Sequence, residues 1–231
     1  MRIHLAWAIL TSVTCCFAAS GCHSDEAAAE SSASEDIQLA NVSTPHGIAA
    51  SAAAAEPQNK ADLLHPKVEI QTDMGNFIVE LDAEHAPLTV DNFLSYVDSG
   101  QYDGTIFHQV LRDYVILGGG FTPQGEQKPA AVPIRNEAHN GLKNRRGTIA
   151  MARDPAAIDS STCQFFINLA DNPALDHTGS EAQNYGYAVF GKVIQGFDVV
   201  ERIGNVEVKS TESFEDAPTT QIVIRSIRRL R

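Results

Sequence analysis

The chain has 231 residues, enough for one domain of ordinary size plus extra segments, and its formal net charge is −12. Such acidity argues against a nucleic-acid partner, which needs a basic patch. Three of the four cysteines, Cys15, Cys16 and Cys22, lie near the N-terminus, so no disulfide framework is implied. The fourth, Cys163, lies in an apolar run and is expected to be a buried structural thiol.

Residues 1–21 have the pattern of a secretion signal. Arg2 precedes an apolar run from Leu5 to Phe17, which is shorter than the roughly 20 apolar residues of a spanning helix. The small residues before Cys22 resemble the processing site of bacterial lipoproteins. This implies lipidation of Cys22 and a periplasmic protein anchored to a bacterial membrane, because several acyl chains give stable anchoring. Cleavage without lipidation is the alternative.

Residues 22–66 are expected to form a flexible acidic tether. They are rich in alanine, serine and glutamate and nearly free of aromatic residues. Such a segment cannot bury enough apolar surface to offset the entropy lost on ordering. The folded domain is therefore expected over residues 67–231.

Two strands and a helix are predicted at the start of this domain. Alternating residues over 68–72 and 76–81 flank Asp73-Met74-Gly75, which is a hairpin pattern. Pro87 suits the first turn of a following helix, and Gly100 suits its end. Between them, apolar residues recur at the spacing of one helical face: Val90, Phe93, Leu94 and Val97.

The stretch from Tyr102 to Thr122 carries the densest structural signals. Apolar, β-branched and aromatic residues over 105–111 and 114–117 predict two neighbouring strands. The triple glycine Gly118–Gly120 allows close approach of backbone or positive φ.

Further strands are predicted over 148–152, 164–169, 188–193 and 221–227, with a short helix over 197–203. The polar, aperiodic stretches 123–146, 154–161 and 171–183 are expected to be loops. About eight short strands with two helices indicate a mainly β fold, a closed antiparallel barrel, because closure removes exposed strand edges. Periodicity alone also allows a sandwich.

Patterns for covalent, phosphate or metal chemistry are missing from the sequence. The triple glycine is not followed by the Lys-Ser/Thr of a phosphate-binding loop. The eight histidines form no i, i+4 pair and no HExxH motif, so neither a metal nor a cofactor is expected. There is no GxSxG motif. The residues are compatible with a binding groove.

Several long runs resemble the cyclophilins, the peptidyl-prolyl cis/trans isomerases. The resemblance extends from about Val68 to Ile227 and is carried by GNFIVELDAEHAPLTVDNFLSY, TIFH, GGGFT, NEAHNGLKNRRGTIAMAR, QFFIN and YAVFGKVIQGFDVV. The NEA…AMAR run is similar to bacterial members. The resemblance implies an eight-stranded barrel with two capping helices. It also implies catalysed rotation about X–Pro bonds, whose uncatalysed barrier is about 18–20 kcal/mol.

The resemblance also implies the site residues. Residues at catalytic positions are His108, Gln109, Tyr114 and Leu117. Residues at substrate-binding positions are Val115, Ala152, Gln164, Phe166, Leu175 and Tyr187.

Two of these positions depart from the family pattern in their chemistry. The family has an arginine, which polarises the proline nitrogen, where this chain has Gln109. It has a glutamine, which holds the substrate backbone, where this chain has Leu117. Tyr114, Val115 and Ala174 replace a phenylalanine, a methionine and an aromatic residue. His108 is as compatible with packing in its strand as with a role in the site.

Two functions follow from these residues. The first is a monomeric isomerase that assists folding of proline-containing polypeptides outside the cytoplasm, with reduced activity. The alternative is a non-catalytic module that binds proline-containing or extended peptides. Strand alternation gives no reason to expect Arg112 to reach back and replace the missing arginine.

Overall fold

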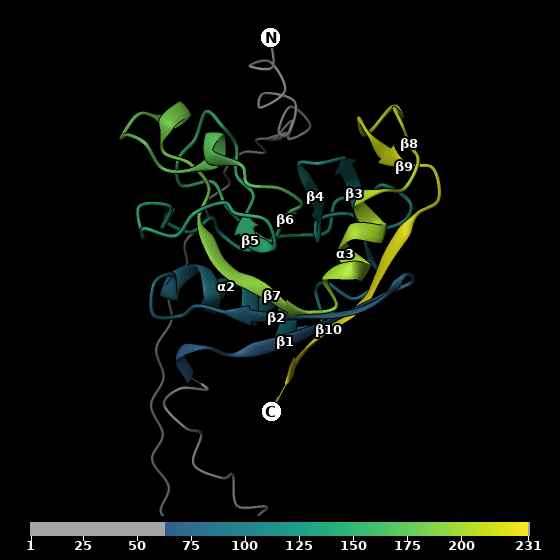
Figure 1. Ribbon diagram of the computed structural model, residues 1–231, viewed down its shortest axis with the longest axis horizontal. Helices are drawn as coiled ribbons and strands as arrows, with labels where there is room; N and C mark the ends of the chain where they lie inside the picture. Colours follow the sequence, from purple (N-terminus) through teal and green to yellow (C-terminus); the bar gives the residue numbers. More distant parts are fainter. Residues whose placement is uncertain (1–62, 231) are drawn as a thin grey trace, which may run out of the picture. The chain divides into compact units, whose positions relative to one another are not determined.

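A closed barrel of antiparallel strands forms the domain in the computed structural model, which describes residues 63–230 (Figure 1). Neighbouring strands follow the order β1-β10-β3-β4-β6-β5-β7-β2, and every adjacent pair is antiparallel. The predicted barrel is confirmed, and the sandwich is excluded. The barrel strands are β1 (Lys67–Thr72), β2 (Gly75–Leu81), β3 (Thr105–Leu111), β4 (Val115–Gly118), β5 (Thr148–Met151), β6 (Phe165–Asn168), β7 (Val189–Gln195) and β10 (Ile222–Leu230).

The predicted signal sequence at 1–21, the lipidation site Cys22 and the tether up to residue 62 lie outside the described residues. Within residues 63–230, no helix combines the length and the apolar character needed to cross a membrane.

Both predicted helices are present, as α2 (Pro87–Asp98) and α3 (Phe197–Gly204). Pro87 occupies the first turn of α2, and the chain leaves the helix through Gly100 at a φ of +69°. No neighbouring side chain caps the start of α2. Instead the Glu137 carboxylate accepts hydrogen bonds from the backbone N–H groups of Leu88 (3.1 Å) and Thr89 (2.8 Å). The long loop before β5 therefore satisfies two donors at the start of the helix.

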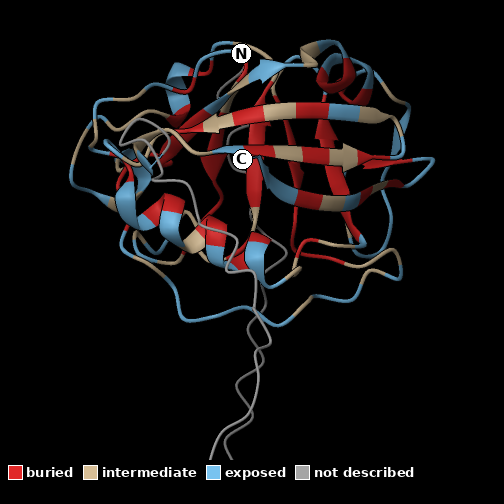
Figure 2. Ribbon diagram, turned by 90° about the horizontal axis from the view of Figure 1, so that it is seen from below, coloured by how far each residue is buried: buried red, intermediate tan, exposed pale blue. Residues whose placement is uncertain are grey.

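The core fills the barrel interior and is sealed by the inward faces of the helices (Figure 2). Phe93 of α2 packs against three aromatic rings of the barrel at centroid distances of 5.1–5.6 Å: Tyr102, Phe165 and Phe190. Val199, Val200 and Ile203 of α3 belong to the same buried cluster.

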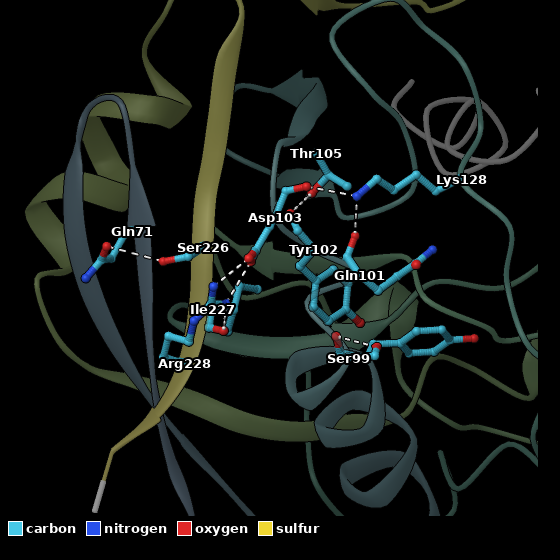
Figure 3. A network of polar contacts seen from close by, with 11 residues as sticks. Gln71, Ser99, Gln101, Tyr102, Asp103, Thr105, Lys128, Ser226, Ile227 and Arg228 are labelled. Atoms are coloured by element: carbon cyan, nitrogen blue, oxygen red, sulfur yellow. Dashed lines mark hydrogen bonds and ion pairs between the residues drawn. The ribbon is translucent and has the colours of Figure 1, made fainter.

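The turn before β3 is fixed by a polar network (Figure 3). Lys128 donates from Nζ to the backbone carbonyls of Gln101 (2.7 Å) and Asp103 (2.8 Å). Arg228 of β10 pairs with the Asp103 carboxylate. Tyr102 donates its hydroxyl to the carbonyl of Cys163 at 2.9 Å, and Cys163 is buried as expected. The segment that leads into β3 is thus tied to three other parts of the chain.

Short elements are present where the sequence predicts no helix or strand. The small hairpin β8 (Val208–Lys209) and β9 (Ala217–Pro218) lies between α3 and β10. Two 3₁₀ turns, η2 (Pro173–Leu175) and η3 (Ala182–Asn184), lie in the loop between β6 and β7. Elements this short have too few residues to produce a periodic pattern, so the sequence does not signal them.

Candidate functional site

A row of side chains crosses the outer face of the barrel from β3 to β7. Gln109 lies opposite Leu117, and Leu117 lies opposite Phe166. Phe166 in turn lies opposite Ala150, which lies opposite Val189. Directly opposed side chains share one face of a sheet, with Cβ atoms about 4.5–5.5 Å apart. The two positions that depart from the expected chemistry are therefore next to each other and beside Phe166.

An apolar cluster separate from the barrel core surrounds this row, and we call it the outer cluster. It belongs to the outer face because the alternate residues of the same strands, such as Ile116 and Ile167, belong to the core. Its members are Leu111, Val115, Leu117, Ala150, Ala152, Phe166, Leu175, Tyr187 and Val189, with Tyr114 and Leu142 packed against them. Most of the predicted site residues are thus gathered in one place.

Gln164 joins the same region through the triple glycine. Ala152 donates its backbone N–H to the Gln164 carbonyl at 2.9 Å. A Cβ atom on Gly120 would lie 2.5 Å from Cγ of Gln164, so only glycine lets this side chain lie against the backbone just after β4. Gly119 adopts a φ of +88°, and a Cβ there would meet the rings of Phe165 and Tyr102 at 2.9 Å. Both expected uses of the glycines are present.

His108 does not lie in the outer cluster, because β3 contains an irregularity at this residue. The register advances by two residues from Phe107 to Gln109 while β4 advances by one, from Gly118 to Leu117. Such a β-bulge re-aims side chains. Phe107 consequently points into the core, and Gln109 faces outward with Leu117. Without the bulge, strand alternation would put Phe107 and Gln109 on one face.

The His108 ring packs against Phe121 and Phe214, at centroid distances of 4.7 and 5.1 Å. Its Nδ1 has no hydrogen-bond partner within residues 63–230. Burial lowers the pKa of His108 to about 3, so the ring is neutral at neutral pH. This environment is that of a packing residue.

The two tyrosines of the site are neutral as well. Burial, together with the nearby Tyr187, raises the pKa of Tyr114 to about 12. Burial also raises the pKa of Tyr187. The outer cluster therefore offers apolar surface, two neutral phenols and the Gln109 amide, and it holds no charged group from the predicted set.

A chain of buried asparagines, which no sequence pattern singles out, supports the cluster. Asn172 donates to the Tyr114 carbonyl (2.9 Å) and to Oδ1 of Asn168 (2.7 Å). Asn168 donates to Oδ1 of Asn144 (3.2 Å), and Asn144 donates to the Leu175 carbonyl (3.0 Å). The backbones of Tyr114 and Leu175 are thus linked by side-chain amides, which fixes two walls of the cluster relative to each other.

A cavity of about 410 Å³ lies beside the cluster and shares Leu142 and Val189 with it. Its other lining is largely charged, including Glu80, Lys143 and Lys192, and it contains none of the predicted site residues. Within residues 63–230, no group of three or more histidine, cysteine or acidic side chains could hold a metal ion.

The family model of the cyclophilin-type peptidyl-prolyl cis-trans isomerases matches residues 67–229, which span the barrel and both helices. The chain belongs to the cyclophilin family.

Cyclophilins of bacteria and of a protozoan are similar to it over nearly their whole length. The peptidyl-prolyl cis-trans isomerase cyp18 of Streptomyces antibioticus is 51% identical, over 69% of this chain and 95% of the relative. The peptidyl-prolyl cis-trans isomerase B of Escherichia coli is 44% identical, over 69% and 97%. A cyclophilin-type isomerase from Cryptosporidium parvum, solved in the presence of the dipeptide Ala-Pro, superposes with a TM-score of 0.60 at 30% identity, covering 71% of this chain and 99% of that one.

The outer cluster of this chain contains most of the positions that match the site motifs of the family.

Arg112 does not supply the charge that Gln109 lacks. Its guanidinium donates to the carbonyl of Asn205, just after α3, at 3.2 Å. The cyclophilin scaffold is therefore complete in this chain, while the polar positions of β3 and β4 carry an uncharged amide and an apolar side chain.

Proposed function

We propose that this cyclophilin turns X–Pro bonds more slowly than relatives that carry arginine and glutamine on β3 and β4. The observation that carries the proposal is the cross-strand pair of Gln109 and Leu117 beside Phe166. A hydrogen bond from a charged group is worth about 1.5–3 kcal/mol. Removal of a preorganised donor to a developing charge lowers rates by roughly 10²–10³. The Gln109 amide can still donate, which supports a slow activity.

Catalysis of rotation about an X–Pro bond depends on how the substrate amide is bound and oriented. Amide resonance sets the barrier, and conjugation is lost as the bond twists, so a site that binds the twisted amide best accelerates rotation. Phe166, Leu175 and Tyr114 supply an apolar wall for the pyrrolidine ring. Gln109 is the donor within the same row of side chains. The substrates are proline-containing polypeptides.

A second candidate function is peptide binding without turnover. Leu117 favours it, because a leucine opposite Gln109 extends the apolar row without a polar contact to the substrate backbone. An apolar or proline-containing segment would then bind through burial of its side chains alone.

Isomerisation kinetics of the full-length chain separate the two functions. The assay follows cis-to-trans conversion of an Ala-Pro peptide for the natural sequence and for the double variant Gln109→Arg/Leu117→Gln. Slow turnover that rises at least tenfold in the double variant supports the reduced isomerase. Binding of the peptide without any exchange, detected by two-dimensional NMR, supports the binding module. Turnover by the natural sequence at the rate of a cyclophilin with both polar residues contradicts the reduced activity.

We further propose that the protein works as a monomer outside the cytoplasm, held to a bacterial membrane by a lipid on Cys22. The support is the sequence pattern of residues 1–22 and the acidic, aromatic-poor segment that follows. Fractionation of cells that produce the Cys22→Ser variant tests the anchor. The variant is expected in the soluble periplasmic fraction. A variant that stays with the membranes after a high-salt wash contradicts lipid anchoring.

A further inference from the structure

A buried arginine lies directly beside the outer cluster. Arg153 follows Ala152 at the end of β5, and only 3% of its surface is exposed. Its guanidinium forms no ion pair with a carboxylate in the described part of the chain. Four backbone carbonyls accept its hydrogen bonds instead: Gly186 from Nε (2.8 Å), Asp154 and Pro155 from Nη1 (2.8 and 3.2 Å), and Ala182 from Nη2 (2.6 Å).

These carbonyls belong to two segments that are far apart in the sequence. Asp154 and Pro155 start the loop after β5, and 182–186 is the end of the loop that leads into β7. One planar guanidinium therefore fixes both segments, since its donors point in set directions from a rigid plane. A lysine ammonium is a point donor and cannot span the same carbonyls.

The same guanidinium also holds a ring of the outer cluster. Its Cζ lies 5.0 Å from the centroid of the Tyr187 ring, within range of a cation–π contact. The same ring also packs against Phe166, whose centroid is 5.6 Å away at an interplanar angle of 80°. The Tyr187 ring thus contacts both Arg153 and Phe166. Its backbone N–H donates to the Leu175 carbonyl at 3.0 Å.

Another arginine of the chain shows what an ordinary contact of this kind looks like. Arg146 lies 4.1 Å above the Phe197 ring, but its side chain is half exposed and it pairs with Glu201. Burial of a guanidinium is costly unless its donors are satisfied. Arg153 is buried without an ion pair among residues 63–230, and its guanidinium donors are satisfied by carbonyls of the two loops beside the outer cluster.

We propose that Arg153 is a positioning residue of the site. It holds the Tyr187 ring against Phe166, and it fixes the two loop segments beside the outer cluster, against which a proline-containing segment binds. The proposal rests on the proposed function, because it assigns a role within the same site. It also predicts a property of the free protein, namely a single fixed orientation of the Tyr187 ring.

The test compares the full-length chain with Arg153→Lys, Arg153→Met and the control Arg146→Met. Two quantities are measured: the NMR signals of the labelled Tyr187 ring without ligand, and the affinity for the tetrapeptide Ala-Ala-Pro-Phe. Both Arg153 variants are expected to shift and broaden the Tyr187 signals. Arg153→Met is expected to weaken peptide binding about tenfold, the equivalent of one lost charged hydrogen bond. The peptide affinity of Arg153→Lys should lie between those of Arg153→Met and the natural chain. The peptide affinity of Arg146→Met should be within twofold of that of the natural chain.

Unchanged Tyr187 signals in folded Arg153→Lys overturn the proposal, even if its melting temperature falls. A peptide affinity within twofold of the natural chain in both Arg153 variants does the same. If Arg153→Met does not fold, Arg153→Lys alone decides. If the natural chain binds no peptide, the proposed function fails, while the free-state Tyr187 signals still decide whether Arg153 positions the ring.

Discussion

Gln109 and Leu117 lie directly opposite each other on β3 and β4, so the two departures from the cyclophilin pattern form one contact. Side chains in this relation are coupled energetically, by about 0.2–1 kcal/mol for ordinary pairs. An arginine at 109 beside Leu117 would place a charge against an apolar side chain. The pair is therefore one unit of the site, and changing one member alone tests something different from changing both.

The first prediction concerns this coupling. Gln109→Arg alone is expected to raise kcat/KM about tenfold, because a charged donor binds the twisted amide more strongly. Leu117→Gln alone should change it less than threefold. The double variant is expected to exceed the product of the single effects, and a double-mutant cycle of kcat/KM measures the excess.

Arg112→Gln is the matched control for that cycle. The substitution removes a positive charge three residues from Gln109. In the natural chain the Arg112 guanidinium donates to the Asn205 carbonyl, away from the site. Its kcat/KM should stay within twofold of the natural chain. Strictly multiplicative single effects would show that the two positions act independently.

The second prediction separates the two faces of β6 with adjacent phenylalanines. Phe165 packs in the barrel core and Phe166 in the outer cluster. Phe165→Leu is expected to lower the free energy of unfolding by about 1–3 kcal/mol with little change in peptide affinity. Phe166→Leu is expected to weaken peptide binding about tenfold or more, because it removes the aromatic floor.

Denaturant unfolding and peptide titration of both leucine variants check the second prediction. Equal losses of peptide affinity in the two variants would mean that Phe166 acts through folding alone.

The third prediction is a pH dependence of stability from His108. The pKa of His108 is about 3 in the folded protein, against about 6.5 in an unfolded chain. Between these values the unfolded state binds a proton that the folded state does not, so stability falls as pH falls from 6.5 and levels off below 3. The slope from this one residue is at most about 1.4 kcal/mol per pH unit.

His108→Leu should remove that part of the slope while it keeps the apolar packing against Phe121 and Phe214. Urea unfolding between pH 3.5 and 7.5 measures the difference. The comparison variant His85→Gln changes an exposed histidine whose pKa Asp82 raises through a hydrogen bond. A raised pKa affects stability only above pH 6.5, so this variant should leave the His108 slope below pH 6.5 unchanged. A His108→Leu protein with the natural slope would contradict the buried neutral ring.

Most of the barrel could be predicted from the sequence, because each long strand and both helices carry a periodic pattern. The face of Gln109 could not be derived in this way. A two-residue period counted from Phe107 puts both side chains inside, and only the bulge at His108 turns Gln109 outward. The resemblance to cyclophilins assigns Gln109 to a catalytic position, but it does not explain why the side chain faces outward.

The support of the site was not predictable either. Asn144 and Asn172 lie in segments whose polarity indicates exposed loops, and Asn168 lies near the end of a predicted strand, yet all three are buried. Their burial depends on partners that are distant in the sequence, such as Asn172 with Tyr114. Arg153 is a similar case, since an arginine after a strand is usually exposed. Polar residues become structural only through contacts that no local pattern encodes.

The last prediction tests the asparagine chain. Asn172→Ala removes the donor to Oδ1 of Asn168 and one of two donors to the Tyr114 carbonyl, which also accepts the Leu169 N–H. A buried acceptor left without a partner costs about 1–3 kcal/mol, so the free energy of unfolding should fall by that amount. Because Tyr114 is then less firmly held, peptide affinity should also fall, by about threefold.

The control Asn205→Ala removes an exposed hydrogen bond to the Glu201 carbonyl and should lower the free energy of unfolding by less than about 0.5 kcal/mol. Chemical denaturation and peptide titration check both variants, and a loss of stability in Asn172→Ala with an unchanged peptide affinity would restrict the asparagines to a role in folding.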